Sequence, residues 1–253
     1  MKILPITLTL LAGIFIVIGS FIVLLARNNK KIVNFSIAMA FSVMILLVLF
    51  ELFPEAIEHI NLFDNKLLNV GLITLFAGLG FLLLKILDLF VPDHHDHEHP
   101  HKDKENNLYH IGLVSSIALS LHNIIEGMAI YIAASSSINL GILIALGVGI
   151  HNIPLGMVMA SAFYKANKNI KKTLFICLLI AVSTVMGGIL ASVINNFINE
   201  LFLGIMLSIT LGMLVYITVF ELFPQIYHDK KRSIFGLITG VGIFILSLLF
   251  HSH

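Results

Sequence analysis

Residues 50–54 read F-E-L-F-P, and the same five residues return at 220–224. Each copy closes a long apolar run and carries one carboxylate, Glu51 in the first copy and Glu221 in the second. Proline lacks a backbone N–H and disturbs the preceding helical turn, so each copy predicts the end of a helix. The repeat decides the fold, because it shows which two parts of the chain correspond.

The composition around the repeat is that of a membrane protein. Of the 253 residues, 58% are hydrophobic and 11% are charged, whereas soluble domains carry about a quarter charged residues. A net charge of +1 without a basic patch argues against nucleic acid as a partner. The single cysteine, Cys177, lies in an apolar run and excludes an internal disulfide.

Long apolar runs predict an all-α integral membrane protein with eight transmembrane helices, because about twenty apolar residues span a bilayer as a helix. No small-residue cleavage site follows the first run, so we interpret it as a retained span rather than a signal peptide. The predicted spans are 4–26, 32–54, 66–91, 109–134, 138–163, 173–195, 201–226 and 233–251.

The charges of the links alternate along the chain. Links 27–31, 164–172 and 227–232 are rich in Lys and Arg, whereas acids prevail in 55–65 and 195–200. Basic links face the cytoplasm, which predicts that both termini lie outside. The small size and the lack of a cleavable signal favour the plasma membrane, the inner membrane of the cell.

This orientation makes the repeat an inverted one. Glu51 ends a span that runs outward, and Glu221 ends a span that runs inward. Matching segments of opposite orientation are typical of inverted-repeat transporters. Spans one to three would then pair with six to eight around spans four and five, a 3+2+3 arrangement within one domain, 1–253. In the alternative interpretation, each F-E-L-F-P is only a helix ending at the headgroup level.

Spans four and five carry polar residues at mid-membrane depth. Residues 120–128 read S-L-H-N-I-I-E-G-M, and 149–157 read G-I-H-N-I-P-L-G-M. Two residues four apart share a helix face, and ionisable groups at this depth usually face a partner or a water path. Two imidazoles and a carboxylate suit zinc or iron; the alternative is a set of interhelical hydrogen bonds. The candidate ligands are His122, Glu126 and His151, with Asn123 and Asn152 as weaker oxygen donors.

Residues 92–108, PDHHDHEHPHKDKENNL, form the one long link, on the cytoplasmic side. Their polarity predicts a loop without a fixed fold. Neutral imidazoles can bind metal loosely, so the loop is either a metal-collecting segment or a solvated tether. Its candidate ligands are His94, His95, His97, His99 and His101.

At these motifs the chain resembles the Zrt/Irt-like protein (ZIP) family of divalent metal transporters. The resemblance covers nearly the whole chain, from the eight spans to the histidine-rich loop. It implies a transporter rather than an enzyme, which carries zinc, iron or manganese into the cytoplasm as substrate and forms a homodimer. It also implies that His122, Glu126 and His151 are the primary ligands, with Asn123 and Asn152 at a neighbouring second position. At the two mouths it implies metal contacts from Glu51, Glu221, His228 and the loop histidines.

Three positions depart from the family pattern. Family members usually carry proline where Ile125 stands, and glutamate or histidine where Leu155 stands. Some also have a carboxylate in span six, where this chain offers only Thr184. We therefore expect the second metal position to be absent or weak.

Two other classes of function are compatible with the cluster. An intramembrane zinc-dependent hydrolase would use a metal-activated water, but it leaves the paired acids without a role. A metal sensor or storage protein would use the histidine-rich loop, but it leaves the buried cluster unexplained.

Overall fold

The computed structural model describes residues 3–26, 29–90, 100–194, 199–226 and 230–250, and every regular element in these ranges is a helix. The all-α fold is therefore confirmed for this part of the chain. The elements are α1 (Ile3–Leu25), α2 (Lys30–Leu47), η1 (Val48–Leu52), α3 (Phe53–His59), α4 (Lys66–Phe90), α5 (Pro100–Ser136), α6 (Ile138–Asn167), α7 (Ile170–Ile194), α8 (Glu200–Tyr216), η2 (Ile217–Leu222), α9 (Phe223–Ile226) and α10 (Lys230–Leu248).

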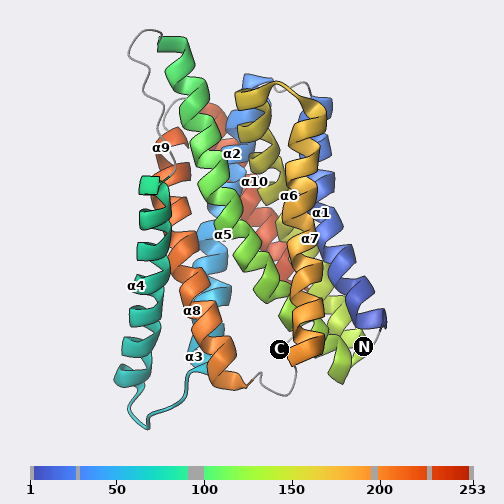
Figure 1. Ribbon diagram of the computed structural model, residues 1–253, viewed down its shortest axis with the longest axis vertical. Helices are drawn as coiled ribbons and strands as arrows, with labels where there is room; N and C mark the ends of the chain where they lie inside the picture. Colours follow the sequence, from blue (N-terminus) through green and yellow to red (C-terminus); the bar gives the residue numbers. More distant parts are fainter. Residues whose placement is uncertain (1–2, 27–28, 91–99, 195–198, 227–229, 251–253) are drawn as a thin grey trace.

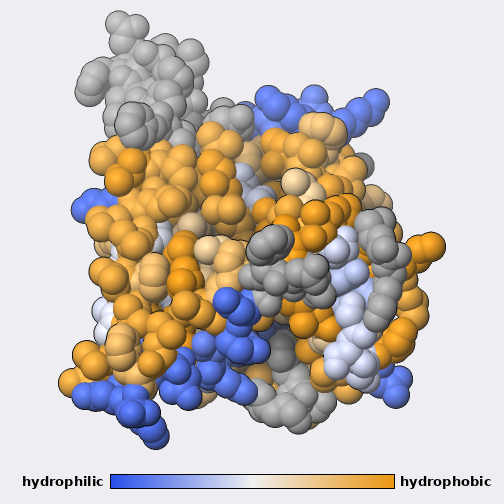
Figure 2. Space-filling view, turned by 60° about the horizontal axis from the view of Figure 1, so that its bottom comes forward, coloured by the Kyte–Doolittle hydropathy of each residue, from blue (hydrophilic) through white to orange (hydrophobic). Residues whose placement is uncertain are grey.

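Seven helices among the described residues are long and apolar enough to cross a membrane. They include the continuous α2–η1–α3 and α8–η2–α9 rods, while the apolar part of α10, Ser233–Leu248, is shorter. Apolar residues cover the sides of the molecule, and hydrophilic residues gather toward its ends (Figure 2). Only 17% of the apolar stretch of α4 is buried inside the protein, so most of this helix has a surface suited to lipid.

Neither F-E-L-F-P proline ends its helix. The first helix runs on to His59, so its predicted end at Pro54 was wrong, whereas the second runs to Ile226, the end predicted for that span. In both copies the preceding residues form a π-helical turn, η1 or η2, and the helix then continues as α3 or α9. The N–H of Phe53 bonds to the carbonyl of Val48, and that of Phe223 to Thr218, five residues back. The wider π turn accommodates a residue that cannot donate. Glu51 therefore lies within a continuous rod, and Glu221 lies near the end of the described part of its rod.

Helix α5 also begins earlier than predicted. It starts at Pro100, so residues 100–108, expected to lack a fixed fold, are helical. Proline is favoured in a first helical turn, and the Lys and Glu residues that follow are good helix formers. His94, His95, His97 and His99 lie outside the described residues, as does His228. The backbone of His101 is helical.

The helices associate as a bundle and two pairs. Helices α1, α5, α6 and α7 pack against one another, whereas α2 packs mainly along α10 and α4 along α8 (Figure 1). The N- and C-termini lie at the same end of the molecule (Figure 1). This end also holds the end of α3 and the start of α8.

Close backbone contact through glycine holds the α4–α8 pair together. A Cβ added at Gly80 would lie 2.0 Å from the carbonyl oxygen of Ile209, and one at Gly212 would lie 1.8 Å from that of Ala77. Only glycine permits this approach, which is typical of helix packing in membranes.

We predict that Gly80→Ala lowers stability by about 1–3 kcal/mol, because the new methyl group collides with backbone that cannot rotate away. Gly78 lies two residues earlier on α4, and a Cβ there meets nothing within 4 Å. Gly78→Ala is thus the matched control, and we expect it to keep or raise the melting temperature. Equal melting temperatures for the two variants in detergent would contradict the packing.

Candidate metal centre

Helices α5 and α6 bring three of the predicted ligands together. Nε2 of His122 lies 2.8 Å from Oε1 of Glu126, and Nε2 of His151 lies 2.7 Å from the same oxygen. One donor atom from each of the three residues lies within 4.8 Å of the others. His122 and Glu126 are one turn apart on α5, while His151 reaches them from α6. The i, i+4 spacing in α5 thus produces the shared face that the sequence predicted.

The three side chains are almost completely enclosed. His122 is 1% exposed, His151 0% and Glu126 8%. The Nδ1 atoms of both histidines and Oε2 of Glu126 have no hydrogen-bond partner. Buried polar atoms without partners are costly, and they are uncommon unless a ligand or water satisfies them. Two imidazoles and a carboxylate that converge in this way fit a divalent ion such as zinc.

The two asparagines are buried beside the cluster, but they differ in their contacts. Asn123 donates from Nδ2 to the carbonyl of Ile180 on α7 at 3.3 Å, and its Oδ1 has no partner. Neither amide atom of Asn152 has a partner, although the residue is 0% exposed. Asn123 thus helps to fix α5 against α7, while both amide oxygens remain free to bind water or an ion.

Glycines fix the helices that carry the cluster. Gly127 follows Glu126, and a Cβ there would lie 1.9 Å from the carbonyl oxygen of Thr184 on α7. A Cβ at Gly156, on α6, would lie 2.0 Å from the carbonyl oxygen of Ile16 on α1. Pro154 lies inside α6, which nevertheless runs unbroken from Ile138 to Asn167. The ligands therefore project from rigid, closely packed helices.

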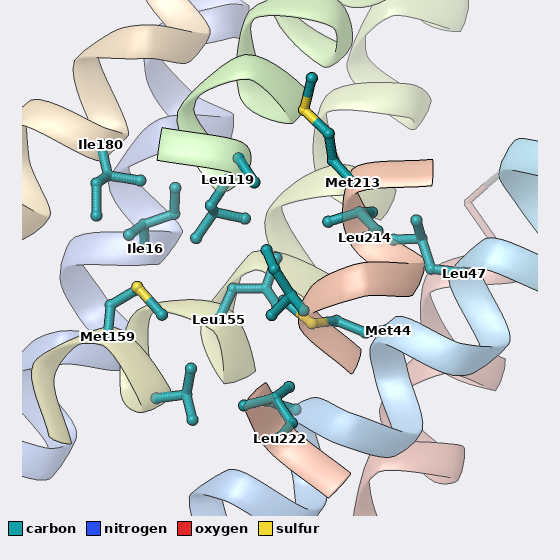
Figure 3. Packing of buried hydrophobic residues seen from close by; sticks show 14 of the residues in the cluster. Ile16, Met44, Leu47, Leu119, Leu155, Met159, Ile180, Met213, Leu214 and Leu222 are labelled. Carbon is teal, nitrogen blue, oxygen red and sulfur yellow. The ribbon is translucent and has the colours of Figure 1, made fainter. Parts of the chain in front are cut away.

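Leu155 and Thr184 occupy the positions where a second metal ion would need a charged ligand, and neither residue carries a charge. Leu155 is 1% exposed and lies in the apolar core. Figure 3 shows it among Met44, Leu214 and Leu222. Thr184 is fully buried, and its hydroxyl oxygen has no hydrogen-bond partner. These two positions therefore supply no charge beyond that of Glu126.

The repeated acids lie outside the cluster, one on each π turn. Glu221 is 7% exposed on η2, and its backbone carbonyl accepts a bond from Nε2 of Gln225 at 2.7 Å. Glu51 is half-buried on η1 and lies close enough to His151 to interact with it electrostatically. The acid of the first copy is therefore coupled to the cluster.

Sequence reasoning missed Glu55, which it assigned to a link. Glu55 lies on α3, is half-buried, and interacts electrostatically with Glu51, Glu126 and His151. The spacing of four residues from Glu51 was the available signal, but the assumption that Pro54 ends the helix concealed it.

A small hollow lies between α2, α5, α6 and the η2–α9 segment. Ser115 lines it two turns before His122 on α5, and Met159 lines it about two turns after His151 on α6. Lys165 and Gln225 line the same hollow. The hollow lies near the start of α2 and the end of α6, and none of the three cluster residues lines it.

Comparison with known proteins gives one consistent result. Residues 91–248 match the family described as ZIP Zinc transporter. A zinc transporter ZupT of Clostridium perfringens is 31% identical, over 96% of this chain and 94% of that protein. ZupT proteins of Streptococcus mutans and Chlorobium luteolum are each 30% identical, over 96% of this chain and 95% and 96% of those proteins.

Proposed function

The chain belongs to the ZIP family of zinc transporters, and we propose that the divalent metal ions it transports, zinc first among them, pass into the cytoplasm through a centre formed by His122, Glu126 and His151. One observation carries this proposal: three buried donors from two helices converge within 4.8 Å. Family membership makes the protein a transporter rather than an enzyme. The hydrolase interpretation is therefore rejected.

The charges at the two ends support eight crossings with both termini outside. We call the end that holds Lys31, Lys165, Lys168, Lys171 and Lys172 the basic end, and the end that holds Glu55, Glu58, Asp64 and Glu200 the acidic end. The positive-inside rule assigns the basic end to the cytoplasm. Helix α10 packs along α2 and would be the eighth crossing.

Matching contacts support the 3+2+3 inverted repeat. The two π turns stand at equivalent places in spans two and seven. Spans two and eight (α2 and α10) pack together, and so do their counterparts, spans seven and three (α8 and α4). Spans one and five (α1 and α6) likewise correspond to spans six and four (α7 and α5). Such paired contacts are those an inverted repeat would produce.

This division also suggests how access alternates. The candidate metal centre lies on the bundle of α1, α5, α6 and α7, whereas Glu51 and Glu221 lie on the two other helix rods. Rocking of the bundle against the remaining helices would expose the centre to each side in turn. The histidine-rich loop and His228 would lie near the cytoplasmic exit, and the homodimer stays a prediction.

Uptake into proteoliposomes tests the function. The purified protein should take up zinc, and the same assay with iron, manganese, cadmium and cobalt would establish its preference. Absence of uptake for every metal by protein that is monodisperse and folded would reject the proposed function.

We further predict that the wild-type centre binds one metal ion per chain and that Leu155→Glu raises this number to two. A carboxylate at this position would add the negative charge that Leu155 and Thr184 lack. Elemental analysis of the zinc-loaded protein, together with anomalous scattering, measures the ratio. Leu155→Gln is the matched control, because it adds a polar group without charge and should still bind one ion. A ratio of one for Leu155→Glu would mean that the second position fails for another reason.

A further inference from the structure

The residue that directly follows the repeat differs between its two copies. The first copy reads F-E-L-F-P-E and the second reads F-E-L-F-P-Q, so Glu55 corresponds to Gln225. Both residues follow a π turn, and both stand four positions after the repeated acid. The acidic end therefore carries two carboxylates, Glu51 and Glu55, where the basic end carries a carboxylate and a neutral amide.

The carboxylate pair at the acidic end is coupled to the candidate metal centre. Glu51 and Glu55 both interact electrostatically with His151, and Glu55 also interacts with Glu126. Glu126 is more than nine-tenths buried, and its Oε2 has no hydrogen-bond partner. The unpartnered oxygen of Glu126 lies on a carboxylate within electrostatic range of Glu55. Like charges repel, so this arrangement points to a cation near the two carboxylates.

At the basic end the counterpart of Glu55 is Gln225, whose neutral side chain should bind a cation more weakly. Nε2 of Gln225 donates to the backbone carbonyl of Glu221 at 2.7 Å, and Gln225 lines the hollow. A neutral amide attracts a divalent cation less than the second carboxylate found at the acidic end.

We propose that Glu55, together with Glu51, captures the divalent cation at the acidic end before it reaches Glu126 and His151, and that Gln225 keeps the opposite mouth weakly binding so that the ion is released there. The proposal rests on the transport function given above. It makes Glu55 and Gln225 a pair that determines how tightly each side of the protein holds its cargo. A site that binds too tightly would not release the ion.

Initial rates of zinc uptake test the first half of the proposal. Glu55→Gln should raise KM about fivefold, because an amide binds a divalent cation more weakly than a carboxylate does. The maximal rate should stay within about twofold of the wild type, since the central ligands are unchanged. Glu58→Gln removes an exposed charge from the same helix, and it should behave as wild type.

The reciprocal variant tests the second half. In vesicles preloaded with zinc, Gln225→Glu should lower the half-saturating concentration for efflux about fivefold, because it places a second carboxylate at the basic end. An unchanged KM for Glu55→Gln, or the same rise in KM for Glu58→Gln, overturns the role of Glu55. An unchanged efflux constant for Gln225→Glu overturns the role of Gln225. If the wild-type protein itself transports no zinc in these vesicles, the proposed transport function is rejected instead.

Discussion

Zinc uptake falls by more than about a hundredfold when His151 or His122 is replaced by alanine. Loss of a group that only orients a ligand costs 10–100-fold in metal affinity, so loss of a direct imidazole ligand should cost at least that much. Each variant leaves Glu126 with a single imidazole beside it. Radioactive or fluorescent zinc uptake into proteoliposomes measures the effect.

His59→Ala is the control for this experiment. Its ring lies at the acidic end, where Nδ1 is 2.5 Å from Oε2 of Glu200, and it is outside the central cluster. We expect this variant to keep most of its uptake. All three variants should elute from size exclusion as the wild type does, which separates loss of a ligand from loss of the fold. Full uptake by His122→Ala and His151→Ala would mean that the site is elsewhere.

The cluster could be predicted from the sequence because its geometry is local. His122 and Glu126 share a helix face through their spacing alone, and His151 repeats the position of His122 in the next span. The length of the apolar runs similarly predicted most of the helices, since a membrane imposes that length.

What the sequence did not reveal depended on backbone geometry between distant parts of the chain. Proline was expected to end two helices, but the π turns before Pro54 and Pro224 let the rods continue. That error concealed Glu55, which the continued helix brings within range of His151. The glycines at helix contacts were visible in the sequence, but their partners were not, because Gly80 and Ile209 lie 129 positions apart.

Glu126→Gln should abolish the stabilisation that zinc confers. Glu126 is the one carboxylate of the cluster in the described residues, and its Oε1 contacts both imidazoles. Glutamine has the same shape but no charge, so the fold should persist while the attraction for a divalent cation is lost. Zinc at about 100 times its Kd should stabilise the wild type by ~2.7 kcal/mol. Thermal unfolding with and without zinc measures this difference, which should vanish in the variant along with uptake.

Glu200→Gln is the matched control, because it removes a carboxylate that is mostly exposed at the acidic end. An exposed ion pair contributes little to stability, so this variant should keep both the zinc-dependent shift and uptake. A shift that persists in Glu126→Gln but disappears in both histidine variants would show that the imidazoles bind zinc without the carboxylate. Glu126 would then only orient the two rings. Loss of the shift in all three variants would instead identify a single centre in which the carboxylate and both imidazoles bind the same ion.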